Sequence, residues 1–200
     1  MTILDLCSYL GLGATGAVTA NLLLGMLMAL RYSPLRQWPH RRINIFFLHR
    51  WTAYLAIVLV LTHPLTLLLV RAPRFRVVDL VWPQWSPLQP KINLAGAGAL
   101  YLVTLVLVTS LLRTRLRRPL WRAIHYAVFP AAALIFLHSI LTDPLLKDGH
   151  PDLLDGGKIF VECCTLLSAA AVAVRWRLRG TGFRPAVPAE PGLPSGAVGK

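Results

Sequence analysis

The chain has 200 residues, of which 56% are hydrophobic and 14% charged, with a mean hydropathy of +0.58. A soluble domain carries about a quarter charged residues, so this composition excludes an ordinary soluble fold and predicts a polytopic membrane protein. The net charge of +13 lies in short loops between apolar runs and has no interleaved aromatic residues, which indicates membrane topology and excludes nucleic acid as a partner.

Five apolar runs are long enough to cross a membrane, which takes about 20 residues. They cover residues 7–30, 43–70, 92–112, 123–142 and 159–174. The last is the shortest and contains Glu162. The sequence therefore predicts an all-α polytopic transmembrane bundle over residues 1–178. The Pro- and Gly-rich residues 179–200 are expected to form a disordered cytoplasmic tail.

The distribution of arginine predicts the orientation of these spans. Basic residues concentrate in residues 31–42, 113–122 and 175–184, which five spans place on one side of the membrane. Most acidic residues fall on the other side. Because cytoplasmic loops are rich in Lys and Arg, we expect an integral protein of a bacterial inner membrane, surrounded by lipid, with its N-terminus outside and its C-terminus in the cytoplasm.

Two of the predicted spans each carry two histidines. His49 and His63 are 14 residues apart, and His125 and His138 are 13 apart. Spans two and four run in the same direction, so His49 matches His125 in depth and His63 matches His138. The helical rise separates the two levels by about 20 Å. Ionisable residues at membrane depth are rare and usually functional, so we expect haem ligation. Another metal, a proton path, or helix packing alone are the alternatives.

The angular positions of these histidines are less regular than their depths. At about 100° per residue, His63 returns to within about 40° of the face of His49, whereas His138 lies about 140° from His125 on an ideal helix. Pro130 lies between the second pair and is expected to kink that helix.

Two segments resemble the paired histidine helices of the ferric reductase-like transmembrane domain. They are FFLHRWTAYLAIVLVLTHPL and RRPLWRAIHYAVFPAAALIFLHSIL. That family includes ferric reductases, NADPH oxidases and the haem subunit of a bacterial periplasmic methionine sulfoxide reductase. The resemblance covers about residues 7–175 and implies two b-type haems, bound by His49 with His125 and by His63 with His138. Many members have six spans, so a sixth is an alternative to the five counted above.

The resemblance also implies partners. The G-x-G-x-x-G of residues 11–16 lies inside the first apolar run and not between a strand and a helix, so it does not indicate a dinucleotide-binding domain. Electrons are therefore expected from a separate flavoprotein, a bound flavin or a quinol. The acceptor outside is expected to be ferric iron, dioxygen or a periplasmic redox partner. Arg50, at the inner end of span two, is expected to contact a haem propionate.

Three other functions stay open. The chain could be a haem subunit dedicated to one periplasmic reductase, such as methionine sulfoxide reductase. It could be a metal-ion transporter that uses its histidines for zinc or protons. It could also be a structural anchor, in which replacing the histidines would change only stability.

Overall fold

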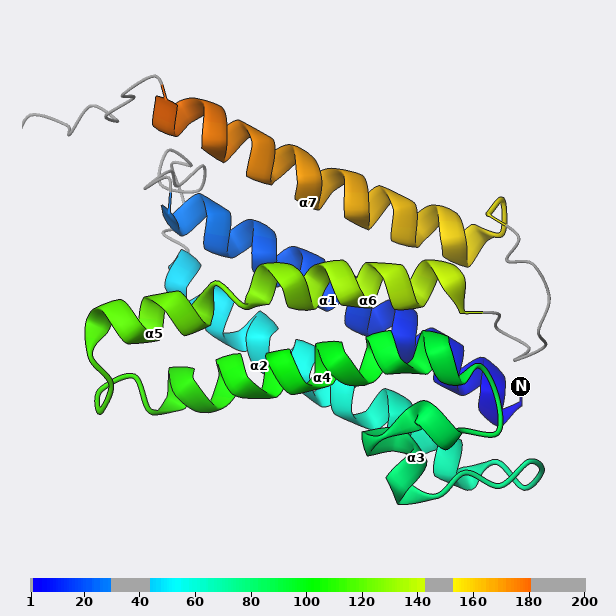
Figure 1. Cartoon of the computed structure of the whole chain (residues 1–200). Coiled ribbons are helices and arrows are strands. Elements are labelled where there is room, and N and C mark those ends of the chain that lie inside the picture. The colour runs from blue at the N-terminus through cyan, green and yellow to red at the C-terminus, as the bar shows by residue number, and fades with distance from the viewer. Residues whose placement is uncertain (1, 30–43, 143–152, 181–200) are drawn as a thin grey trace, which may run out of the picture.

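The computed structural model describes residues 2–29, 44–142 and 153–180, and its regular structure there is helical (Figure 1). The long helices are α1 (Ile3–Ala29), α2 (Ile45–Leu65), α4 (Pro90–Leu111), α6 (Val128–Leu141) and α7 (Gly156–Gly180). The short ones are η2 (Thr66–Leu69), α3 (Val77–Val81), η3 (Pro83–Trp85) and α5 (Arg118–His125). The basic segment 31–42 and residues 181–200 of the expected tail lie outside the described residues.

Five helical stretches within the described residues are long and apolar enough to span a membrane, which confirms the all-helical, five-span prediction. They are Ile3–Ala29, Ile45–Leu69, Pro90–Leu111, Arg118–Leu141 and Gly156–Leu178. The second joins α2 to η2, and the fourth joins α5 to α6. In Figure 1 the stretches α2–η2 and α5–α6 run in the same direction, as the histidine pairing requires.

The helices associate as two antiparallel pairs with α7 against one side. Helix α1 packs along α2, α4 packs along α6, and α7 lies on α1 and α6. Within the described residues, α2 and α6 make no extensive direct contact. The buried core lies instead between α1, α6 and α7, where Leu22, Phe136 and Val161 belong to one cluster. The two histidine-bearing helices are therefore held beside each other mainly by their neighbours.

The fourth span is interrupted between His125 and His138, where the angular positions of these two residues on an ideal helix predicted a distortion. Helix α5 ends at His125, and α6 begins at Val128. Pro130 is the third residue of α6, where a backbone N–H has no intrahelical acceptor, so the proline loses no hydrogen bond there. The N–H of Phe129 donates to the carbonyl of Tyr126 at 3.1 Å, which closes the turn. The expected distortion thus takes the form of a turn upstream of Pro130.

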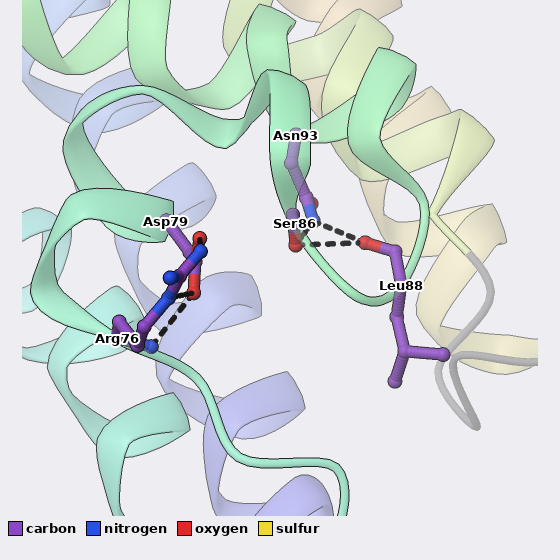
Figure 2. A network of polar contacts seen from close by, with 5 residues as sticks. All are labelled: Arg76, Asp79, Ser86, Leu88 and Asn93. Carbon is purple, nitrogen blue, oxygen red and sulfur yellow. Dashed lines mark hydrogen bonds and ion pairs between the residues drawn. The ribbon is translucent and has the colours of Figure 1, made fainter.

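A short irregular segment, residues 71–89, covers the end of the bundle at which α1 begins, and we call it the cap (Figure 1). The Arg76 backbone N–H donates to Asp79 Oδ2 at 2.8 Å, and its guanidinium Nη2 lies 3.2 Å from Asp79 Oδ1 (Figure 2). The guanidinium of Arg76 keeps the pKa of the Asp79 carboxyl below its ordinary value. The Tyr101 hydroxyl donates to the carbonyl of Val81, which ties the cap to α4.

The second half of the cap is fixed to the start of α4. The Asn93 side chain donates to the carbonyl of Leu88 at 2.9 Å, and the Ser86 hydroxyl donates to the same oxygen at 3.0 Å (Figure 2). Gln89 precedes the helix with a φ of 46°, a left-handed conformation that is uncommon for a residue with a side chain. Polar bonds at both ends of the cap thus hold it over the bundle.

Candidate functional site

Two histidines, which we call the outer pair, face each other beneath the cap. They lie at the end of the bundle that is expected to be outside the membrane. His63 comes from the last turn of α2 and His138 from the last turn of α6. Their ring centres are 6.3 Å apart, with an interplanar angle of 72°. Two imidazoles that ligate one metal from opposite sides, with metal–nitrogen bonds of about 2 Å, have ring centres about 6 Å apart. The spacing of this outer pair therefore suits a shared metal between the rings.

Backbone carbonyls set the tautomer of both outer rings. His63 Nδ1 lies 2.9 Å from the carbonyl oxygen of Cys7, and His138 Nδ1 lies 3.0 Å from that of Ile92. A carbonyl only accepts, so each Nδ1 carries the proton and donates. The other ring nitrogen, Nε2, keeps a free lone pair. Metal-ligating histidines typically donate such a hydrogen bond from the ring nitrogen that does not bind the metal.

His49 and His125, which we call the inner pair, have hydrogen-bond partners of different kinds. His49 Nδ1 lies 3.1 Å from the carbonyl oxygen of Asn21, so it resembles the outer rings. The Asn21 side chain also donates to the carbonyl of His49, at 2.6 Å. His125 Nδ1 instead lies 3.5 Å from the Ser110 hydroxyl, and its ring stacks on Trp121 with centres 5.0 Å apart.

A cavity of about 100 Å³ borders both outer rings and extends under the cap to Asp79. Sites for drug-sized ligands are larger, at roughly 300–1,000 Å³. A flat macrocycle would therefore enter only if the lining side chains moved apart. Such a movement would break few contacts, because α2 and α6 lack extensive packing against each other.

The outer pair supplies two ligands, so a metal bound there would need its remaining ligands from another molecule. Within the described ranges, no group of three or more His, Cys, Asp and Glu side chains could hold a metal ion. The outer level instead offers two opposed imidazoles. This number suits the iron of a porphyrin, which supplies the other four ligands itself. The residues present thus fit a haem better than a bare ion.

A family comparison agrees with this geometry. The profile of the ferric reductase like transmembrane component matches residues 14–136, more than half of the chain. The chain belongs to this family. Comparisons with curated proteins and with solved structures give no match. Membership implies haem-linked electron transfer across a membrane. The match includes His49, His63 and His125 and ends two residues before His138, whose role as a ligand stays a prediction.

In this ferric reductase-like component, the inner end of the site carries Arg50 and Trp121. Arg50 is exposed on α2, with its guanidinium carbon 5.8 Å from the centre of the Phe47 ring. Its contact with a haem propionate stays a prediction. Trp121 Nε1 is buried and has no hydrogen-bond partner among the described residues. Because Trp121 stacks on His125, its N–H is a donor close to the ring of His125.

Sequence reasoning found the histidines and missed the groups that hold them. The Thr142 hydroxyl, at the end of α6, lies 3.4 Å from His138 Nδ1. The other partners of the histidine Nδ1 atoms come from α1 and α4, and they are Cys7, Asn21, Ile92 and Ser110. Three of them act through backbone oxygen, which every residue has, so side-chain type gives no signal. The sequence contained one signal. Cys7 and Asn21 are 14 residues apart, as are His63 and His49, which they face on the antiparallel α2.

Proposed function

We propose that this chain carries electrons across the membrane through two b-type haems, one bound by His49 and His125 and the other by His63 and His138. The observation that carries the proposal is the outer pair, with ring centres 6.3 Å apart and each Nδ1 bonded to a backbone carbonyl. A bis-histidine haem, when bound, exchanges single electrons at an iron with no open position.

The protein's residues have three tasks in this scheme. The Nδ1–H bonds orient the rings and leave Nε2 of each free to bind iron. Mostly apolar residues, among them Val60, Leu100 and Ile135, line the cavity beside the outer rings, and such surroundings tune the potential of a bound group. The 14 residues between His49 and His63 separate the two levels by about 21 Å of helical rise, so electrons can pass from one side of the membrane to the other.

The direction and the partners follow from the expected orientation, with the N-terminus outside in a bacterial inner membrane. A cytoplasmic flavoprotein, a bound flavin or a membrane quinol is oxidised at the inner level. An acceptor is reduced at the outer level, beneath the cap. Ferric iron and dioxygen are acceptors that need no dedicated partner.

A second candidate is a haem subunit dedicated to one periplasmic reductase. The cap presents exposed apolar side chains at the outer end of the bundle, namely Val77, Trp82 and Trp85. A patch of this kind suits a protein surface. Co-purification of a soluble periplasmic enzyme, with electron transfer to it, would favour this candidate. Reduction of a ferric chelate by the protein without such a partner would favour a free-standing reductase.

The decisive experiment is haem counting on the purified protein by visible spectroscopy and the pyridine haemochrome assay. We expect two haems per chain. Alanine at His49 or His125 should remove one haem, and alanine at His63 or His138 should remove the other. A colourless protein with stoichiometric zinc would refute the proposal and point to a transporter. Loss of stability without any change in haem content would point to a structural role.

A further inference from the structure

Three of the four histidines share one arrangement with the helix they face. In each case the Nδ1 atom bonds a backbone carbonyl, and the residue four positions after that carbonyl is a glycine in contact with the same imidazole. The three sets are Cys7 and Gly11 with His63, Asn21 and Gly25 with His49, and Ile92 and Gly96 with His138.

Helix geometry explains why the glycine stands at this position. The Cα–Cβ bond in a helix tilts toward the N-terminus, so a side chain covers the turn that precedes it. A side chain four residues after a carbonyl therefore lies over that carbonyl and blocks a donor from a neighbouring helix. A glycine leaves the oxygen open, although it still accepts its intrahelical bond.

The space for a side chain differs among the three positions. A Cβ at Gly96 would lie 3.1 Å from Nδ1 and 3.2 Å from Nε2 of His138. A Cβ at Gly11 would lie 3.0 Å from Cε1 and 3.1 Å from Nδ1 of His63. A Cβ at Gly25 would meet His49 Cε1 at 3.4 Å, which is ordinary contact. The outer rings are thus confined more tightly than the inner one.

We propose that Gly11, Gly25 and Gly96 are positioning residues, which expose a backbone carbonyl to each imidazole and so fix its tautomer and its direction. The inference rests on the proposed function, because it assigns these imidazoles to iron. A ligand histidine that donates from Nδ1 is more basic at Nε2. A more basic ligand stabilises ferric iron, so the arrangement lowers the reduction potential of the haem it serves.

His125, the fourth histidine, faces a hydroxyl where the other three face a backbone carbonyl. Ser110 lies 14 residues after Gly96, as Gly25 lies 14 after Gly11. At this position a hydroxyl, 3.5 Å from His125 Nδ1, replaces the open carbonyl. A hydroxyl rotates and can donate as well as accept, so it does not fix the tautomer as a carbonyl does. The inner haem therefore has one firmly oriented ligand, whereas the outer haem has two.

The test compares glycine-to-alanine variants of the full chain, purified with haem. Gly96→Ala and Gly11→Ala remove space at the outer rings, and Gly25→Ala does so more mildly at the inner one. The matched controls are Gly98→Ala and Gly13→Ala, which lie two residues further along the same helices and face Leu134 and Leu59. Haem content, the low-spin electron paramagnetic resonance spectrum and the midpoint potential of each haem are measured.

We expect Gly96→Ala to have the largest effect, Gly11→Ala a similar or smaller one and Gly25→Ala the smallest. Retention of the outer haem should weaken about 10- to 100-fold in the first two. The haem that remains bound should show an altered g-tensor and a higher midpoint potential. The controls should match the wild type. If an outer variant fails to fold, Gly25→Ala still tests the inference through the inner haem potential.

The outcomes separate this inference from the proposed function. A wild-type protein without haem would refute the proposed function, and the glycine inference with it. A wild-type protein with two haems, together with glycine variants whose potentials and resonance spectra equal those of the controls, would refute the glycine inference alone. Equal losses in the variants and the controls would also refute it, because they would show a general packing effect.

Discussion

Replacing Lys158 by methionine should destabilise the outer end of the bundle. Lys158 is 4% exposed, and its ammonium donates to the carbonyls of Ser139 and Ile140, each at 2.7 Å, and to that of Thr142. These carbonyls close the C-terminal end of α6, which carries His138. A buried cation there also interacts favourably with the helix dipole.

The size of the effect follows from these bonds. A hydrogen bond to a charged group contributes about 1.5–3 kcal/mol, and methionine fills a similar volume without a donor. Partial repair by water leaves an expected loss of about 3 kcal/mol for the three bonds together. In a chain of this size, 1 kcal/mol corresponds to about 2–4 °C, so the midpoint of thermal unfolding should fall by about 6–12 °C.

The assay is thermal unfolding in detergent, followed by circular dichroism and by the visible absorbance of haem. Lys91→Met is the matched control, because Lys91 is exposed at the start of α4. As the end of α6 frays, His138 should be displaced, so the outer haem should be lost before the inner one. A Lys158→Met protein that unfolds together with the control, or that loses the inner haem first, would show that this reasoning is wrong.

Three further predictions concern the cap and the inner end of the site. Arg76 lowers the pKa of Asp79, so the pair stabilises the cap at neutral pH, and this contribution is lost as the pH falls through the lowered pKa. The protection factors of amides in the cap, which correct for the slower intrinsic exchange at low pH, should therefore fall in acid, and Asp79→Asn should show low protection already at neutral pH. Asn21→Ala removes the side-chain bond to the carbonyl of His49 and should cost about 1–2 kcal/mol in unfolding measurements. Trp121→Phe keeps the stacked ring but removes the buried N–H, and haem titration should show weaker retention of the inner haem alone.

Each of these has its own control and its own contrary result. An acid-induced fall in protection that persists in Asp79→Asn would mean that another group controls the cap. Asn93→Ala, at the other end of the cap, should leave the inner haem unchanged, whereas Asn21→Ala should loosen it. For Trp121→Phe, equal loss of both haems would indicate general destabilisation, and Trp51→Phe on the exposed face of α2 serves as the neutral comparison.

Much of the architecture could be predicted from the sequence because membrane burial acts on each segment separately. Each span must be apolar for about 20 residues and must satisfy its own backbone hydrogen bonds, so the order and direction of the helices follow from local composition. The depth of the four histidines follows as well, since the rise per residue is fixed. The matching in depth of His49 with His125 and of His63 with His138 required nothing beyond these two facts.

The details at the ends of the spans could not be read in this way. The turn at Tyr126–Ala127 replaces a continuous fourth helix, and it lies between His125 and His138, which ideal helix geometry places about 140° apart. The exposed position of Arg50 depends on which face of α2 meets α1. Neither feature is fixed by composition, because both depend on how one helix rotates against its neighbours.

The sequence by itself determined the membrane spans, their alternating directions and two levels of imidazole, because hydropathy and helical rise are properties of single segments. Only the tertiary structure decided which carbonyl each Nδ1 meets and where a missing side chain opens that carbonyl. It also decided how α1 and α4 hold α2 and α6 beside each other. These are contacts between segments far apart in the chain, and a backbone oxygen is the same in every residue until a neighbouring helix selects it.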